Sequence, residues 1–196
     1  VVFHDDASHL PEEISTFARQ QWWKKASGFR ADSNLWFRPL DVEKELDFYR
    51  QCRGEAWLNI HGSWDFYDGE AFAADALAQW HADHRSVMCA MLGDEPVGVI
   101  QMDLGRDADQ GVGYIPFVYM LPSFRQHGMG VQLIGQAVAT YRPLGRDRLR
   151  LRCAPDNHIA QRFYKRYGFH KIGEAEGTRV PLDLMEKYIG YGGYQG

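Results

Sequence analysis

The sequence has little of what marks membrane-spanning or nucleic-acid-binding chains. No apolar run approaches the roughly 20 residues that cross a bilayer. Basic residues are not in excess, with 22 Lys and Arg against 26 Asp and Glu, a formal net charge of -4. Binding to nucleic acid depends on a basic surface that displaces counterions. We therefore expect neither a membrane nor a nucleic acid as partner.

Cysteine is also scarce, with three residues at positions 52, 89 and 153. They lie far apart and form no Cys-x-x-Cys pair, which argues against a disulfide framework and against a metal site. Free thiols of this kind fit a reducing compartment, so we expect a cytoplasmic protein. Hydrophobic residues make up 45% of the 196 residues, enough for one packed domain with an appendage.

The residue pattern divides the chain into an N-terminal extension or remnant of a preceding domain (1–34), a mixed α/β domain (35–189) and a glycine-rich flexible tail (190–196). Pro116 falls inside an expected strand and cannot donate to a ladder, which predicts a bulge or a gap there. We expect strands at 1–3, 35–38, 86–92, 97–104, 111–121, 149–153, 169–174 and 182–189, and helices at 11–27, 42–53, 69–84, 131–144 and 158–167.

A glycine-containing turn joins the strand at 111–121 to the next helix. Its sequence is Arg125-Gln126-His127-Gly128-Met129-Gly130. Glycines at this spacing let successive backbone N–H groups turn inward, and the following helix adds its positive end, which together suit a pyrophosphate. The turn matches neither the Walker nor the dinucleotide pattern. Alone, it is equally compatible with a connection that binds nothing.

A second motif follows, Asn157-His158-Ile159-Ala160-Gln161-Arg162-Phe163-Tyr164-Lys165-Arg166-Tyr167-Gly168-Phe169. The glycine turn after a strand, and this Asn-x-x-Ala-x-x-Phe-Tyr-x-x-x-Gly-Phe pattern, resemble the GNAT superfamily over residues 35–189. The resemblance implies an α/β (α+β) fold with a mixed, largely antiparallel sheet, a central splayed strand pair and flanking helices. It also implies transfer of an acetyl group from acetyl-CoA to an amine within a ternary complex.

The resemblance places the co-substrate acetyl-CoA residue by residue. Backbone groups of Val118, Tyr119 and Met120 would pair with the pantetheine arm, and a backbone N–H near Met120 would polarise the thioester carbonyl. Asn157 would contact the cofactor or a water, or act only as a helix N-cap. Tyr164 would protonate the departing thiolate, or only pack in the core. The pyrophosphate would meet Arg125, Gln126, His127, Gly128, Met129, Gly130 and Val131.

The general base is where the sequence departs from the family. Several members carry a glutamate on the splayed strand or just before the asparagine motif, and these positions hold Tyr114 and Arg152 here. A base must take a proton from the acceptor, because alkyl amines are mostly protonated at neutral pH. Tyr114 is the catalytic candidate that we retain, with three alternatives: His61, Asp65 and Asp103.

The resemblance implies that the loop between the first two helices of the domain, placed at 57–68, shapes the acceptor pocket. Aromatic faces and carboxylates suit a cationic amine, so Trp64, Asp65 and Tyr67 are the candidate substrate-binding residues. The alternative is that these aromatics only fix the helices to the sheet. A row of arginines follows in the strand at 149–153 and suits the 3′-phosphate of CoA, an acidic partner or solvent: Arg146, Arg148, Arg150 and Arg152.

Residues 1–10 resemble the C-terminal end of histidine-phosphatase domains, which implies a longer two-domain protein. The alternative is an ordinary extension packed by Trp22 and Trp23.

The competing function is a non-catalytic CoA-binding regulatory module, favoured by the missing glutamate. A third function is that of an interaction domain with a vestigial site. The acceptor is expected to be a small-molecule or peptide amine, and pairing among family members implies a possible homodimer.

Overall fold

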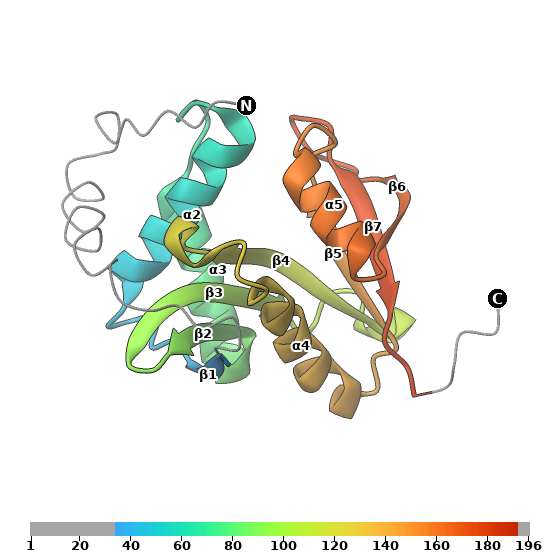
Figure 1. The fold of residues 1–196 in the computed structure, drawn as a ribbon, viewed down its shortest axis with the longest axis horizontal. Coiled ribbons are helices and arrows are strands. Elements are labelled where there is room, and N and C mark those ends of the chain that lie inside the picture. Colours follow the sequence, from blue (N-terminus) through green and yellow to red (C-terminus); the bar gives the residue numbers. More distant parts are fainter. Residues whose placement is uncertain (1–33, 192–196) are drawn as a thin grey trace. The chain divides into compact units, whose positions relative to one another are not determined.

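The structure is a computed structural model, and it describes residues 34–191. Within them, seven strands form one sheet in the order β1-β2-β3-β4-β5-β7-β6 (Figure 1). All neighbours are antiparallel except β4 and β5, which are parallel. The predicted fold class is confirmed. The strands are β1 (Trp36–Pro39), β2 (Val87–Leu92), β3 (Glu95–Asp103), β4 (Val112–Met120), β5 (Arg148–Cys153), β6 (His170–Glu174) and β7 (Asp183–Tyr188).

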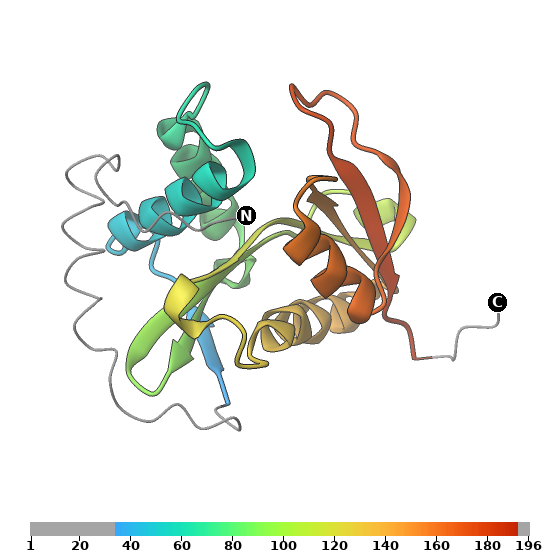
Figure 2. The same ribbon diagram turned by 45° about the horizontal axis from the view of Figure 1, so that its top comes forward.

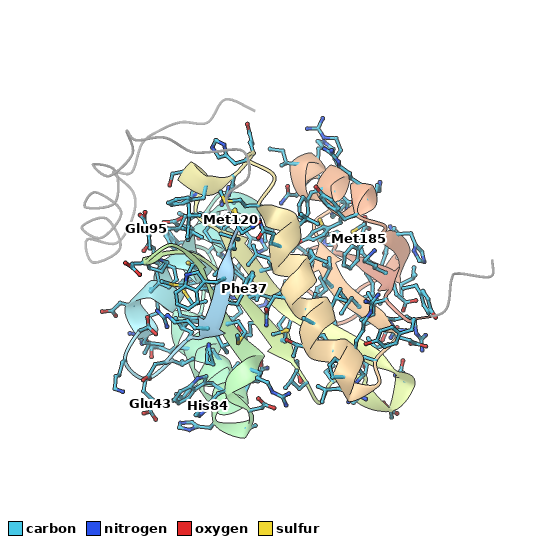
Figure 3. All side chains as sticks on the ribbon, turned by 60° about the horizontal axis from the view of Figure 1, so that its bottom comes forward. Phe37, Glu43, His84, Glu95, Met120 and Met185 are labelled. Carbon is cyan, nitrogen blue, oxygen red and sulfur yellow. The ribbon has the colours of Figure 1, made fainter. Side chains whose placement is uncertain are left out.

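Helices cover both faces of this sheet. Figures 1 and 2 show α2 and α3 on one side of β3 and β4, and α4 on the other. Figure 3 looks onto the α4 side, where Met120 and Met185 lie on either side of that helix. The helices are α2 (Leu46–His61), α3 (Gly69–Ala82), α4 (Gly130–Tyr141) and α5 (His158–Arg166), with short 3-10 turns at His84–Ser86, Ala108–Gln110, Pro122–Phe124 and Arg142–Leu144.

The sheet splits at Pro116, as its sequence position predicted. β4 pairs with β5 only through Val112–Ile115 and runs unpaired along that edge from Pro116 onward. On the other edge, the register of β3 against β4 shifts between Gln101 and Asp103, so the bulge lies opposite the proline. Since proline has no N–H to donate, the ladder is interrupted there. Figure 2 shows the two strands separating.

Tyr141, the last residue of α4, holds the backbone at this split. Its hydroxyl lies 2.5 Å from the carbonyl oxygen of Tyr114 and 3.1 Å from that of Asp103. Gly113 makes the approach possible, because a Cβ on it would lie 2.4 Å from the Tyr141 ring. The tyrosine is fully buried. It therefore fixes the two strands on either side of the bulge.

We expect Tyr141→Phe to lower the free energy of unfolding by about 1–3 kcal/mol, because it leaves buried carbonyls without a donor. Urea denaturation of the two proteins measures this. Tyr167→Phe is the matched control, since the Tyr167 hydroxyl makes no hydrogen bond to another residue of 34–191. An equal stability for the two variants would contradict the bracing role of Tyr141.

Several element bounds differ from the expectation. The helix expected at 42–53 runs over Leu46–His61 instead, because Gly54 is buried inside it and does not end it; Gly62, with φ +68°, does. The connection between β2 and β3 is two residues long, since Pro96 already pairs within β3. The expected strand at 1–3 and helix at 11–27 lie outside the described residues. The other elements agree to within about two residues, apart from the 3-10 turn at Arg142–Leu144.

All three cysteines are buried and unpaired with one another. Burial raises the pKa of the Cys89 and Cys153 thiols to about 12 each, and that of Cys52 well above its ordinary value. None of the helices within residues 34–191 combines the length and the apolar character that crossing a bilayer requires.

Candidate active site

The free edge of β4 presents backbone groups beside the split. The N–H of Leu121 donates to the carbonyl of Val97 on β3 at 2.9 Å. Because backbone groups alternate in direction along a strand, those of Val118 and Met120 point away from β3, toward the split. The Met120 carbonyl accepts a hydrogen bond from Nε of Arg125 at 2.8 Å. The N–H groups of Val118 and Met120 face the gap between β4 and β5.

The side chain of Tyr119, between these two residues, contacts helix α2 and Arg125. Its hydroxyl donates to Oε2 of Glu55 on α2 at 2.7 Å, and the Arg125 guanidinium lies 4.7 Å from its ring centroid. Arg125 therefore ties the glycine turn to the end of β4. Burial raises the pKa of Tyr119 far above the ordinary tyrosine value, so its phenol stays protonated.

The glycine turn has the backbone conformation that an anion cradle requires. Gln126 and Gly128 both have positive φ, at +64° and +72°. Helix α4 begins at Gly130 without a side-chain cap. No hydrogen bond from the backbone N–H of Gln126, Gly128, Met129, Gly130 or Val131 to any residue of 34–191 is found. Such orphan donors at a helix N-terminus favour an anionic ligand, and they fit the pyrophosphate of CoA.

The two sequence motifs meet in space. A Cβ on Gly130 would lie 3.1 Å from the ring of Phe163, so the start of α4 packs directly against α5. Asn157 caps α5, with Oδ1 accepting from the N–H of Ala160 at 3.1 Å. Its capping role is therefore present whether or not it also contacts a cofactor. His127 lies in the same turn.

Tyr164 follows Phe163 on α5. Its ring packs edge-on against Phe163 and Phe169, with centroids 5.4 and 5.5 Å away. The hydroxyl makes no hydrogen bond to another described residue. Burial is the main cause that raises the pKa of Tyr164 well above its ordinary value, with a smaller contribution from Cys153. The phenol is thus protonated at neutral pH and has a proton to give.

A cavity of about 250 Å³ opens on the α2–α3 side of the split. Pro116 lies in the wall of this cavity, so the cavity is directly beside the interrupted ladder. Aromatic rings and charged groups from five elements and one loop face it: Tyr49, Arg53, Phe72, Asp75, Asp103, Arg106, Tyr114 and Arg152. The candidate bases from the sequence that lie in this wall are Tyr114 and Asp103, and Arg152 of the arginine row lies there too. Arg53 and Asp75, on two consecutive helices, were missed, and no motif marks them.

The other acceptor candidates lie elsewhere. Trp57 and His61 belong to α2 rather than to a loop, which corrects the expected boundary, and the connection spans 62–68. Tyr67 packs between Trp57 and Phe72, at 5.7 and 5.8 Å between ring centroids. None of these aromatic neighbours except Phe72 lines the cavity.

Trp64, Asp65 and His61 are likewise outside the cavity wall. Trp64 packs edge-on against Tyr67, at 5.1 Å. Asp65 accepts a hydrogen bond from the Ser63 hydroxyl at 3.0 Å. The His61 ring packs at a tilt against Trp57, with the ring centroids 3.9 Å apart, and burial lowers the pKa of His61. The aromatic loop is therefore a packed cluster at the end of α2, at one side of the cavity residue Phe72.

The electrostatics of Tyr114 bear on its role as a base. Burial raises its pKa, and the nearby guanidinium groups of Arg152 and Arg106 oppose that shift only in part. The Arg106 guanidinium lies 3.7 Å from the ring centroid. A phenol that stays protonated cannot accept a proton at neutral pH, so it can only hold or relay one. Carboxylates in the same cavity, Asp75 and Asp103, are the chemically suitable acceptors.

A model of the acetyltransferase (GNAT) family matches residues 46–169, which include the split, the glycine turn and the asparagine motif. The chain belongs to this acetyltransferase (GNAT) family. This GNAT chain is 27% identical over 131 residues to the aminoglycoside N(6')-acetyltransferase type 1 of Salmonella typhimurium, across 64% of the chain and 86% of the relative. Acetyl-CoA-dependent N-acetyl transfer is its activity, as the sequence resemblance implied.

Solved structures share the GNAT fold. Ard1 from Thermoplasma volcanium has a TM-score of 0.62 at 20% identity, covering 79% of this chain and 97% of its own. The yncA protein of Salmonella typhimurium, solved with its cofactor acetyl-CoA, has a TM-score of 0.61 at 16% identity, covering 83% and 98%. The expected histidine-phosphatase likeness of residues 1–10 is not borne out by these comparisons, and those residues lie outside the described part of the chain.

Proposed function

We propose that this GNAT acetyltransferase transfers the acetyl group directly from acetyl-CoA to an amine, with both bound at the split between β4 and β5. The proposal assigns residues 35–189 to the acetyltransferase domain. The free N–H groups of Val118 and Met120, in line with those of the glycine turn, are the observation that supports it most. An extended arm with amide groups would complete the missing ladder along β4.

The protein's own groups then have separate tasks. Acetyl-CoA supplies an activated thioester. The Met120 N–H donates a hydrogen bond to the carbonyl oxygen as negative charge develops there, which is typically worth about 2.7–4 kcal/mol. A C–N bond forms to the amine and the C–S bond breaks. The Tyr164 hydroxyl gives its proton to the departing thiolate. The backbone N–H groups of residues 126–131, Gly128 included, hold the pyrophosphate.

The amine must lose a proton before or during attack. Asp75 and Asp103 line the cavity from which it would approach, and either carboxylate can accept that proton through water. Tyr114, held beside them, positions the amine or the water by hydrogen bonding.

The three cysteines support the expected reducing, cytoplasmic compartment. A homodimer stays a prediction from the family resemblance.

We expect acetyl-CoA to bind saturably, and CoA to be released only when a suitable amine is added. Titration calorimetry measures the first, and CoA release across an amine panel that includes an aminoglycoside measures the second. Binding without release for any amine would favour the regulatory module instead. Absence of binding at high micromolar acetyl-CoA would contradict both functions.

A further inference from the structure

Three guanidinium groups line one cavity and have no ion-pair partner among residues 34–191. Arg53, Arg106 and Arg152 all line it. Their guanidinium groups make no ion pair and no hydrogen bond with other residues of 34–191, and each lies near the face of an aromatic ring. Arg50, one turn earlier on α2, behaves differently, since its guanidinium pairs with Glu70 at 2.6 Å. The neighbouring arginine outside the cavity is therefore paired, whereas the three in the cavity wall are not.

Arg53 is the most buried of the three. Its guanidinium lies 4.0 Å from the ring centroid of Phe72 and 4.5 Å from that of Phe117. Burial lowers its pKa, which means that the charge has lost much of its water. Aromatic faces offset part of that loss, but a desolvated cation is stabilised fully only by an anion. No carboxylate among residues 34–191 lies within ion-pair distance of it.

The neighbouring polar groups are already committed to one another. The Tyr49 hydroxyl donates to Oε1 of Gln101 at 2.7 Å, and Nε2 of Gln101 donates to Gln79 at 2.9 Å. Oδ1 of Asp103 accepts from the backbone N–H groups of Gly105 and Arg106, at 3.2 and 3.1 Å. These groups are thus fixed, and the guanidinium groups, Asp75 and the second carboxylate oxygen of Asp103 are available to a ligand.

Charges of both signs face one small volume. Asp75 and Asp103 oppose the three arginines, so the wall has a formal surplus of one positive charge (three minus two). The volume of about 250 Å³ lies below the usual range of roughly 300–1,000 Å³ for drug-sized ligand pockets. An extended polycation fits this wall poorly, because it meets more like charge than unlike charge.

We propose that the acceptor of this acetyltransferase is a small zwitterion, an amine that also bears a carboxylate, and that Arg53 binds the carboxylate. The planar guanidinium fork matches a carboxylate with two parallel hydrogen bonds. Arg106 and Arg152, both exposed, attract the same group at the mouth of the cavity. The amine then faces Asp75 and Asp103. This assignment rests on the proposed function and names the substrate class that its site selects.

The test compares free amino acids (α, β and γ) with their own amides and with the corresponding simple amines. At least one free acid should be acetylated with a kcat/KM about tenfold or more above that of its amide. The amine of an amide is less basic and therefore more often neutral at pH 7, so that preference cannot come from amine protonation. Amides, simple amines or aminoglycosides outpacing the acids throughout would overturn the proposal.

Two variants on one helix locate the effect. Arg53→Met replaces the arginine with an unbranched apolar side chain of similar width that lacks the guanidinium, and should raise the KM of the acid about tenfold and abolish the preference over the amide. Arg50→Met, matched in substitution and outside the cavity, should change neither. Equal losses on acid and amide in Arg53→Met would contradict carboxylate recognition.

Product binding separates this inference from the proposed function. With CoA present, the N-acetylated acid should bind wild-type protein more tightly than its N-acetylated amide, by titration calorimetry, even where turnover is undetectable. CoA binding by Arg53→Met serves as the check that this variant is folded. If Arg53→Met does not fold, the double variant Arg106→Met and Arg152→Met replaces it, and the affinities for the acetylated acid and the acetylated amide are compared in the same way. Equal binding of acid and amide to wild-type protein overturns the zwitterion, whatever the rates are.

Discussion

Tyr164→Phe should lower kcat about a hundredfold or more while leaving the affinity for CoA nearly unchanged. General acid catalysis by a positioned side chain is worth about 10²–10⁴ in rate, and phenylalanine keeps the ring that packs on Phe163 and Phe169. Steady-state rates with saturating acetyl-CoA and calorimetric titration with CoA measure the two quantities separately. A large loss of affinity with little change in kcat would make Tyr164 a binding residue.

The pH dependence gives a second readout for Tyr164. Because burial raises its pKa, the phenol keeps its proton above the pH at which an ordinary tyrosine ionises. The wild-type kcat should therefore hold on the alkaline side until pH exceeds about 10, and then fall as the acid is lost. Tyr164→Phe should lack that alkaline fall. Identical profiles for the two proteins would remove the tyrosine from proton transfer.

Gly128→Asp should weaken acetyl-CoA binding about a hundredfold relative to Gly128→Asn. Both side chains tolerate the φ of +72° at this position better than other residues do, and a Cβ there meets nothing within 4 Å. The two variants differ only in a charge, placed among N–H groups that would hold a pyrophosphate. Two unit charges about 4 Å apart near a surface interact by about 4 kcal/mol, enough for such a loss after screening.

Calorimetric titration of both variants with acetyl-CoA makes the comparison, at low and at high salt. The difference should shrink as ionic strength rises, because the repulsion acts at a partly exposed turn. Gly128→Asn should itself bind within about tenfold of wild type, since only the strain at one residue changes. Equal affinities for the two variants would place the phosphates away from the glycine turn.

The fold could be predicted where local sequence determines local geometry. Asp68 directly precedes the helix expected at 69–84, and its Oδ1 accepts from the N–H of Ala71 at 2.9 Å. The interruption at Pro116 was predicted because proline has no N–H to donate to a neighbouring strand. The helix expected at 42–53, by contrast, continues through Gly54. Tertiary packing overrides its weak helix propensity, since it lies buried inside α2.

The cavity could not be predicted in the same way. Arg53 and Asp75 are 22 residues apart and face one volume only because α2 and α3 pack side by side on the sheet. No spacing in the sequence encodes that meeting. The aromatic and acidic composition of the loop with Trp64, Asp65 and Tyr67 suggested an acceptor pocket, but its rings pack on one another and none of the three residues lines the cavity. The positions of the cofactor residues, unlike those of the cavity, could be predicted because two sequence motifs mark them. Their roles stay predictions.

The buried cysteines have a practical consequence for measuring this enzyme. Free CoA has an exposed thiol, whereas Cys52, Cys89 and Cys153 are enclosed and hold their protons far above neutral pH. A disulfide reagent that reacts with thiolates can therefore follow product continuously on native protein with little background. Because the three residues lie in α2, β2 and β5, the same reagent reports loss of structure in three separate parts of the molecule when the protein is heated without substrate.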